Sequence, residues 1–244
     1  VIPGVPEISP GDDLANVLLA CLDKAEMTIE DGDILVIAQK VVSKAEGRLV
    51  DLTQVIPSYD AHMLAEKVNK DPRKLEVILG ESKRIVRAVK RSDVKEGIVI
   101  TEHNLGFVCA NAAVDESNCA QSDTLILLPE DPDASAVKIR ERLEAAFGCR
   151  IGIVITDTFG RPWRMGLVNV AIGLAGVPAE VDLAGELDAF GRPLTVTSPA
   201  LADELAAASG LLMTKDGMTP AILFKGVEWQ SQKSSARDLV RPQQ

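Results

Sequence analysis

The sequence predicts one structural unit of the α+β class, in which helices pack against mixed and antiparallel sheets. Predicted helices and strands interleave irregularly along the 244 residues and do not repeat a strand-helix-strand unit. No segment recurs at a fixed period, and no low-complexity linker divides the chain. Apolar residues make up 46% of it, which is enough for a sizeable core. We therefore expect residues 1–244 to form a single unit, with a polar tail at about 227–244 that frays.

Apolar spacing and start signals predict five helices. Residues 12–26 carry apolar side chains at helical spacing behind Pro10-Gly11-Asp12. Three others begin at an Asp-Pro or Ser-Pro pair, where the first residue caps the helix and proline fits its first turn. The four helices after the first are expected at 58–70, from 71–72 onward, at about 132–147 and at about 199–213.

Runs rich in β-branched residues, bounded by Gly, Pro or Asp, predict the strands. The first covers 33–42 after Asp31-Gly32, and we expect it to be mostly buried and to end at Ser43-Lys44, before a turn at 45–48. The other strands are expected at 84–90, 97–101, 106–110, 124–128, 150–156 and 219–224.

Charge and composition exclude several kinds of partner. A net charge of −10 repels nucleic acid and anionic membranes. The longest near-continuous apolar stretch, 166–179, is shorter than the roughly 20 residues that span a bilayer. No basic segment followed by an apolar one opens the chain, so we expect a cytoplasmic protein. The four cysteines form no C-x-x-C pair and are expected to be reduced core thiols: Cys21, Cys109, Cys119 and Cys149.

Motifs of several common enzyme classes are absent from the sequence. It contains no phosphate-binding loop of the G-x-x-x-x-G-K-[ST] type, no G-x-G-x-x-G, no G-x-S-x-G and no H-E-x-x-H. Only His62 and His103 are present, each without a nearby candidate nucleophile, which argues against a Ser/His or Cys/His hydrolase. The remaining chemistry is that of carboxylates, a hard cation and basic side chains.

Two polar clusters follow apolar strands, FVCANAAVDESN at 107–118 and IGIVITDTFGRPWRMG at 151–166. Asp115 and Asp157, with the hydroxyl of Thr158, provide oxygen ligands of the kind that Mg²⁺ or Mn²⁺ accepts beside phosphate oxygens and water. We expect Asp157 just beyond the buried strand, with the chain turning through 159–162. An acid in this position also commonly caps a turn or a helix, and that alternative stays open.

Two further segments suit phosphate binding. Lys44 follows a predicted strand, and a compact ammonium group binds a phosphate chain as a point charge. The loop at 213–218 lies between a predicted helix and a strand and can close over a nucleotide, or be an ordinary connection. Its residues are Met213, Thr214, Lys215, Asp216, Gly217 and Met218.

Five segments resemble the coenzyme F420-0:L-glutamate ligase (F420:γ-glutamyl ligase) family in order and spacing: VSKAEGR, NAAVDESN, VITDTFGRPWRMG, AIGLAG and DAFGRPL. The resemblance extends from IPGVPEI, near the start, to about Gly226. It implies a GTP-dependent ligase that attaches L-glutamate to the carboxylate of a deazaflavin precursor, F420-0, and adds further γ-linked glutamates. A carboxylate does not condense with an amine in water, so the reaction requires an acyl phosphate made from GTP, with GDP and phosphate released. The site must keep water from that anhydride.

The resemblance also implies residue roles. Asp115 and Asp157 are the expected ligands of a first metal ion and Thr158 of a second, with Mg²⁺ or Mn²⁺ as the metal. The residues expected to contact GTP are Val5, Pro6, Glu7, Ile8, Gln39, Lys40, Lys44, Asn118 and the loop 213–218. Lys215 stands where an archaeal member has an acid for the second metal, so either Asp216 takes that role or Lys215 replaces part of the charge.

Arg161 and Arg164 are assigned by chemistry, because arginine suits bidentate contacts with a phosphodiester or with the carboxylates of glutamate. An ion pair with acids of this chain is the alternative. The resemblance further implies an intertwined homodimer, and in bacterial members a fused flavin-binding reductase domain. A ligase for a different carboxylate and a non-catalytic nucleotide-binding protein remain alternatives, and a role for a monovalent cation stays open.

Overall fold

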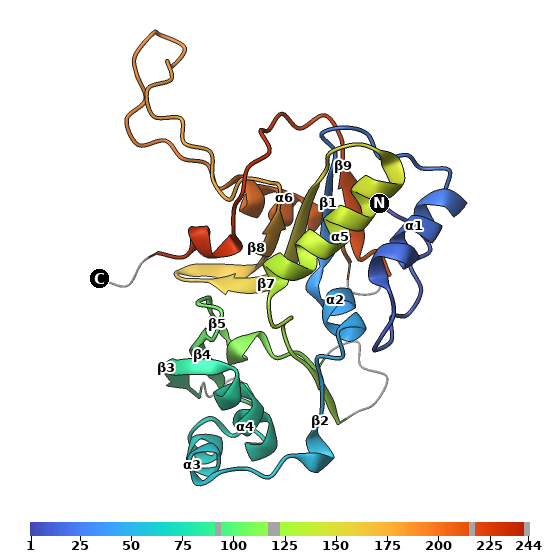
Figure 1. The fold of residues 1–244 in the computed structure, drawn as a ribbon. Coiled ribbons are helices and arrows are strands. Elements are labelled where there is room, and N and C mark those ends of the chain that lie inside the picture. Colours follow the sequence, from blue (N-terminus) through green and yellow to red (C-terminus); the bar gives the residue numbers. More distant parts are fainter. Residues whose placement is uncertain (91–93, 117–122, 215–217, 242–244) are drawn as a thin grey trace.

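The computed structural model describes residues 1–90, 94–116, 123–214 and 218–241 (Figure 1). The α-helices are α1 (Leu14–Lys24), α2 (Gln39–Ala45), α3 (Tyr59–Val68), α4 (Pro72–Gly80), α5 (Pro132–Phe147) and α6 (Leu201–Ser209). The strands are β1 (Ile34–Ala38), β2 (Leu49–Asp51), β3 (Ser82–Val89), β4 (Ile98–His103), β5 (Val108–Ala110), β6 (Thr124–Ile126), β7 (Gly152–Arg161), β8 (Arg164–Ala175) and β9 (Ala221–Phe224). Short 3₁₀ turns lie at Leu52–Gln54, Asn111–Ala113 and Ala236–Leu239. The expected α+β class with mixed and antiparallel sheets is confirmed.

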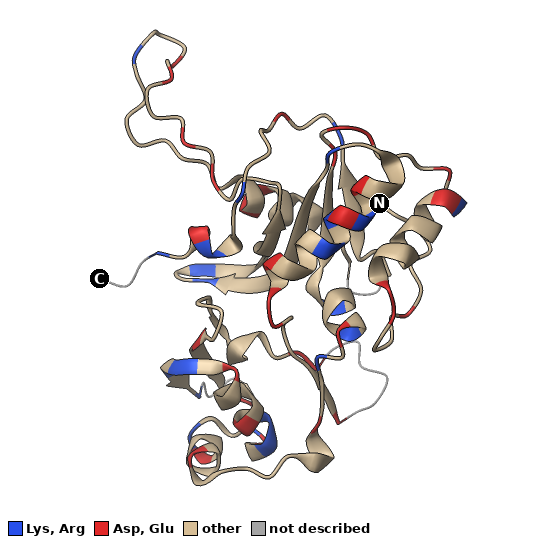
Figure 2. Cartoon of the chain, viewed as in Figure 1, with Lys and Arg blue, Asp and Glu red and all other residues tan. Residues whose placement is uncertain are grey.

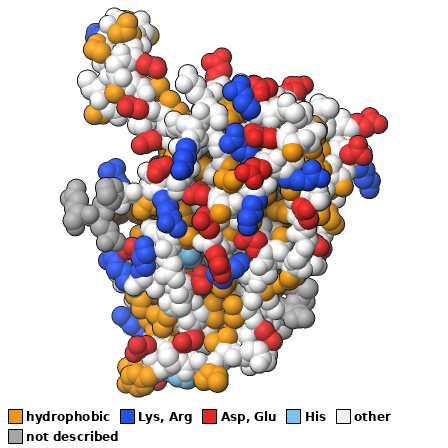
Figure 3. Space-filling model, in the orientation of Figure 1, with side chains coloured by type: hydrophobic (Ala, Val, Ile, Leu, Met, Phe, Trp, Pro, Cys, Tyr) orange, Lys and Arg blue, Asp and Glu red, His pale blue; other side chains and the backbone are white. Residues whose placement is uncertain are grey.

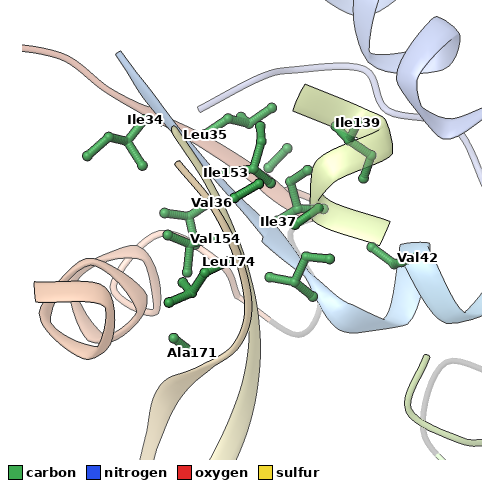
Figure 4. Close-up of a cluster of buried hydrophobic side chains, with 14 of the residues drawn as sticks. Ile34, Leu35, Val36, Ile37, Val42, Ile139, Ile153, Val154, Ala171 and Leu174 are labelled. Atoms are coloured by element: carbon green, nitrogen blue, oxygen red, sulfur yellow. The ribbon is translucent and has the colours of Figure 1, made fainter. Parts of the chain in front are cut away.

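A four-stranded mixed sheet in the order β8-β7-β1-β9 forms the centre of the larger part of the molecule. Strand β1 runs parallel to β7 and antiparallel to β9, and β7 pairs antiparallel with β8. Helices α5 and α6 cover opposite faces of this sheet (Figure 4). Because both faces are covered, β1 is a nearly continuous apolar run whose first four residues are fully buried.

A smaller part of the chain packs around its own apolar cluster. It consists of α3, α4 and the antiparallel sheet β3-β4-β5, with Leu75, Ile78 and Val99 buried between helices and sheet. Strands β2 and β6 pair antiparallel, and they lie where the chain passes from the central sheet to this smaller part and back again. Phe107 meets Phe159 of β7 edge to face at 6.2 Å, which joins the two parts near the candidate site.

Local signals placed three helix starts correctly and the first one two residues early, because α1 begins at Leu14. Asp13, Ser58, Asp71 and Asp131 each accept a hydrogen bond from a backbone N–H in the first turn, and proline follows Asp71 and Asp131. The fifth start is wrong, because α6 begins at Leu201 with no side-chain cap and ends at Ser209. The Ser198 hydroxyl instead donates to the carboxylate of Glu180.

The expectation of a strand over 33–42 is also wrong in its second half. Strand β1 ends at Ala38, and residues 39–45 form helix α2. The Ala38 N–H donates to the carbonyl of Pro220, which has no N–H to return and so ends the ladder with β9 at this point. The buried side chains of α2 include Gln39, Val42 and Ser43, whose spacing is helical.

The predicted turn at 159–162 is replaced by a long hairpin. Strand β7 continues through Asp157 to Arg161, and after Pro162-Trp163 strand β8 returns from Arg164. No strand was predicted over β8, although Pro162 precedes it and Gly176 follows it. Asp157 therefore lies within a strand and not just beyond one. A shift in the β7–β8 register between Ile155 and Thr156 precedes it directly, and such bulges redirect the side chains that follow.

The tail is ordered further than expected. Trp229 Nε1 donates to the Gly32 carbonyl at 2.7 Å, and the Ser235 hydroxyl donates to Asp133 of α5. Ala236 is fully buried in a short 3₁₀ turn. These contacts hold residues 229–239 against the body. Cys21, Cys109 and Cys149 carry free thiols, as predicted, while Cys119 lies outside the described residues. Within the described residues, no helix is both long and apolar enough to cross a membrane.

Candidate active site

A cavity of about 660 Å³ opens where the central sheet meets the segment that follows β5. Its walls come from the N-terminal segment, from the start of α2, from the β7–β8 hairpin, from residues 110–115 and from both ends of the 213–219 loop. Nearly all of the residues predicted for nucleotide or metal binding that the structure describes lie on these walls. They are Val5, Pro6, Glu7, Gln39, Lys40, Lys44, Asp115, Asp157, Thr158, Met213, Thr214 and Met218.

Asp157 occupies a partly buried position on β7 and lines this cavity. Burial raises the pKa of its carboxyl to about 7, and the negative charge of Asp115 adds to the rise. The Thr158 backbone N–H, Lys40 and Gln39 lower the pKa by smaller amounts. The loss of water around the Asp157 carboxylate thus raises its pKa by more than the neighbouring donors and Lys40 lower it.

Asp115 approaches from the other part of the chain. Its backbone exchanges two hydrogen bonds with Ile126, at 3.0 and 2.8 Å, which fixes the segment against β6. Its Oδ2 atom lies 2.7 Å from Lys40 Nζ. The structure thus brings two carboxylates and an ammonium group together from three separate segments. Sequence spacing gave no sign of the ion pair.

The turn before Asp115 has an unusual backbone. Asn111, Ala112 and Ala113 have φ angles of 52°, 52° and 54°, in the left-handed region that disfavours residues with a Cβ atom. Ala112 is fully buried, so a larger side chain has no room there. This left-handed geometry makes the close turn between β5 and Asp115. Strained backbone of this kind is often found at functional sites.

The carboxylates and the hydroxyl fit a divalent cation in their chemistry. Thr158 Oγ1 donates to Asn169 Oδ1 at 2.8 Å, so the lone pairs of its oxygen stay available to a cation. Within the described residues, no group of three or more His, Cys, Asp or Glu side chains could hold a metal ion. A cation between Asp115 and Asp157 would need further oxygens from Thr158, water or a bound phosphate.

The cationic side of the cavity comes from α2. Lys44 is 8% exposed, and its Nζ lies 2.5 Å from Oε1 of the exposed Glu7. Gln39 is buried, and its Oε1 accepts from Ser43 at 2.7 Å. Among the described residues its Nε2 has no hydrogen-bond partner of normal geometry, although it lies near enough to Asp157 to lower the pKa of that carboxyl. A polar ligand entering the cavity can satisfy this buried donor.

Several predicted residues lie elsewhere. Ile8 is buried in the main core and does not line the cavity, while Asn118, Lys215, Asp216 and Gly217 are outside the described residues. Arg161 and Arg164 lie at the tip of the hairpin, beyond the cavity walls. Arg161 donates through Nη2 to the Met165 carbonyl at 3.2 Å, and its buried Nε has no partner among the residues that the structure describes. Within the described chain neither arginine forms an ion pair with an acid.

Some residues that line the cavity were not predicted, because their positions depend on the pairing of β7 with β8. Asn169 and Leu167 come from β8, which places Asn169 opposite Thr158. Asn169 is a polar residue inside the apolar run 166–175, which is a signal that the sequence does offer. Only the register of the hairpin shows that it lies beside Thr158. Ala110, at the end of the predicted strand 106–110, and Ala113 and Val114 after it also line the cavity.

A cavity of this size between rigid elements, with a few converging charged groups, is typical of enzymes that bind small molecules. The chain matches the family described as F420-0:Gamma-glutamyl ligase over residues 4–226, and it belongs to that family. A protein of Methanopyrus kandleri named coenzyme F420:L-glutamate ligase is 46% identical over 245 residues, covering 98% of this chain and 92% of its own length.

Two other proteins with the same name are similar to nearly the same extent. The one from Methanothermobacter thermautotrophicus is 42% identical and covers 100% of this chain and 95% of its own length. The one from Methanocaldococcus jannaschii is 44% identical and covers 90% and 86%. The resemblance inferred from the five quoted segments is thereby confirmed.

Proposed function

We propose that this protein is a GTP- and divalent-metal-dependent ligase that adds L-glutamate to coenzyme F420-0, and further glutamates through γ-linkages. Membership of the family supports the ligase activity and its two substrates. One observation carries the GTP and metal dependence, namely the convergence of Asp115, Asp157 and Lys40 on one cavity wall. Phosphoryl transfer needs this combination of charges, because its catalysis is largely positioning and neutralisation of phosphate oxygens.

In this proposal, separate residues of the cavity bind the phosphates, hold the metal ions and exclude water. Lys44 and Lys40 neutralise the phosphates of GTP as point charges, and each has a carboxylate partner, Glu7 or Asp115, with which a phosphate competes. Asp115, Asp157 and Thr158 would hold one or two Mg²⁺ or Mn²⁺ ions, which stabilise the charge that develops on the transferred phosphoryl group. The apolar walls at Ala110, Val114 and Leu167 reduce the access of water to the acyl phosphate.

The atoms of the reaction balance in two steps. The acceptor carboxylate attacks the γ-phosphorus of GTP, which forms an acyl phosphate and releases GDP. The amine of glutamate then attacks the acyl carbon, an amide bond forms, inorganic phosphate leaves with the bonding electron pair, and the nitrogen gives up one proton to the departing phosphate. Arg161 and Arg164 are proposed to contact anionic groups of the two substrates, as bidentate donors.

Mass spectrometry of the acceptor tests the proposal. Protein is incubated with F420-0, L-glutamate, GTP and Mn²⁺, and parallel reactions omit GTP or the metal. We expect a mass gain of one or more glutamyl units that requires both. If GTP is hydrolysed without any gain, a different carboxylate is the acceptor. If GTP binds and no GDP is released, the protein is a non-catalytic nucleotide-binding member of the family.

We also propose that two copies of the chain associate. Residues 180–198 form an arm that projects from the body (Figure 3). The arm is closed by its own backbone hydrogen bonds, such as that from the Leu183 N–H to the Thr197 carbonyl. It exposes Leu187, Phe190 and Val196 by 67%, 84% and 91%. Large apolar side chains on an arm of this kind favour a covering partner. A homodimer with exchanged arms, in the cytoplasm, is the arrangement we propose.

A further inference from the structure

The sheet β3-β4-β5 has one covered and one open face. Val99 and Ala88 pack toward α3 and α4 on the covered face. The ladder registers put Arg87, Ile100 and Ala110 in line on the opposite face, because Ile100 pairs with Arg87 on one side and with Ala110 on the other. Ile98 and Val108 share that face by strand alternation and are 41% and 55% exposed.

This open face borders the cavity. Ala110 lies on the face and also lines the cavity that holds Asp115 and Asp157. Ile98, Ile100 and Ala110 therefore form an apolar strip that leads out of the candidate active site. Val108 extends this strip along β5, where it lies opposite Glu102, a carboxylate of the same face that pairs with Lys83 and Arg84. Neighbouring strands are about 4.8 Å apart, so the face is about 10 Å wide from β5 to β3. A flat multi-ring molecule can lie on a surface of this kind.

Charge marks the far border of the strip. Strand β3 carries Lys and Arg side chains (Figure 2). Arg84 is held by Glu102, with its Nε 2.7 Å from Oε2, so this pair is internally neutralised. In the part of the chain that the structure describes, Arg87 has no acidic partner. An unpaired guanidinium beside an apolar strip suits the face or the oxygen-bearing edge of an aromatic ring.

We propose that this open face is the platform on which the aromatic ring of the acceptor lies. The acceptor carboxylate enters the cavity, the ring rests on Ile98, Ile100 and Val108, and Arg87 contacts the outer edge of the ring. The inference rests on the proposed function for the identity of the acceptor, a deazaflavin with a phosphodiester and a terminal carboxylate. Continuity with the cavity and the positive border favour this occupant over a second copy of the chain.

Two substitutions on exposed positions test the platform. Val108→Glu and Arg87→Glu should raise the acceptor KM at least about tenfold, a loss of about 1.4 kcal/mol in binding. The KM for GTP and kcat should stay within about twofold. Val137→Glu and Arg142→Glu, on α5, are matched controls and should leave all three constants unchanged. Arg87→Lys should restore part of the affinity. An unchanged acceptor KM in both test variants would overturn the platform.

An acceptor without the ring distinguishes a loss of ring binding from a general loss of activity in the variant. With an acceptor that keeps the carboxylate and phosphodiester but lacks the ring, wild type and Val108→Glu should react equally slowly. A further loss in the variant would contradict the inference. Direct titration of the deazaflavin into protein without GTP, followed by its fluorescence, tests the platform even if wild type performs no ligation. A tenfold weaker Kd for Val108→Glu is the expected result.

The alternative occupant has a distinct signature. If the face joined two copies of the chain, Val108→Glu would lower the mass measured by sedimentation and leave the deazaflavin Kd unchanged. That outcome would replace the platform with an interface. If the proposed function itself is wrong, the wild-type protein will transfer no glutamate to the acceptor, although it and all variants are folded. This result differs from a wrong platform, for which wild type and variants transfer glutamate with the same acceptor KM.

Discussion

Single residues at the cavity determine how it responds to pH. Asp157 has a pKa near 7 because its carboxylate has lost water, and Asp115 lies close by. In an unfolded chain the pKa would be about 3.9. The folded protein therefore binds a proton more tightly than the unfolded chain, and the free energy of unfolding falls as pH rises from about 4 to about 7.

Substituting Asp157 with asparagine should remove the loss of stability that comes from ionising a buried carboxyl group. Above pH 7 we expect metal-free Asp157→Asn to unfold at a higher temperature than wild type, because no buried charge has to form. Near pH 4 the two proteins should unfold at similar temperatures, since Asp157 is then neutral in the folded state. Calorimetric scans at pH 4.5 and 8 in a chelating buffer would measure this. A lower unfolding temperature for the variant at pH 8 would contradict the assigned environment.

Asp115 has a separate expected role in turnover. Asp115→Ala should lower metal-dependent kcat/KM by at least about 100-fold, because it removes one of two carboxylates that face the proposed cation. Asp60→Ala, on the exposed first turn of α3, is the control and should retain activity. Steady-state GDP release at several Mn²⁺ concentrations would measure both. Normal metal-dependent turnover in Asp115→Ala would exclude Asp115 as a ligand.

Short elements, more than single side chains, set the shape of the site. Helix α2 places Gln39, Lys40 and Lys44 on the cavity, and the β7–β8 hairpin places Asp157, Thr158 and Asn169. Both elements depend on pairing with distant segments, because α2 begins where the ladder of β1 with β9 ends at Pro220, and β7 is extended by its pairing with β8. Local sequence favoured a longer β1 and a shorter β7, and in each case tertiary pairing overrode that preference.

The left-handed turn at Asn111–Ala113 offers a prediction at this scale. Ala113→Gly should preserve or raise stability, because a left-handed residue with a Cβ costs roughly 1–2 kcal/mol and glycine avoids this cost. Ala113→Val should destabilise by a similar amount, since a β-branched residue tolerates positive φ poorly. Urea unfolding of the three proteins gives the order. A more stable valine variant would show that the turn is not left-handed.

Close packing of α5 on β8 gives a second prediction for an element. A Cβ atom on Gly173 would lie 2.6 Å from backbone atoms of Pro132, so Gly173→Ala must push α5 away from the sheet. We expect a loss of roughly 1–3 kcal/mol in the free energy of unfolding. Gly160→Ala on β7 is the matched control, because the nearest atom to its Cβ is 4.0 Å away. Equal stability of the two variants would contradict the close contact.

At the scale of the whole molecule, the candidate site lies between two parts with separate apolar clusters. Asp115 belongs to the segment that leaves the smaller part, and Asp157 to the central sheet. The relative position of the two parts therefore sets the distance between the carboxylates. The Phe107–Phe159 contact holds the parts together beside the cavity.

The arm leads to a prediction about assembly. If two copies exchange their arms, replacing Leu187, Phe190 and Val196 with serine should lower the mass measured by sedimentation equilibrium from that of a dimer to that of a monomer. The arm packs little against its own body, so the free energy of unfolding of each monomer should change little. A wild-type protein that sediments as a monomer at micromolar concentration would exclude the dimer.

By itself, the sequence determined the α+β class and the capped starts of α3, α4 and α5, and it singled out two carboxylates, Asp115 and Asp157, that line one cavity. These depend on local spacing and on long, specific segments, which are readable without knowing what lies nearby. The tertiary structure decided that residues 39–45 are helical, that β8 pairs with β7, and that Lys40 meets Asp115. The physical reason is that burial, strand register and ion pairs join residues far apart in the chain, and no local pattern records those distances.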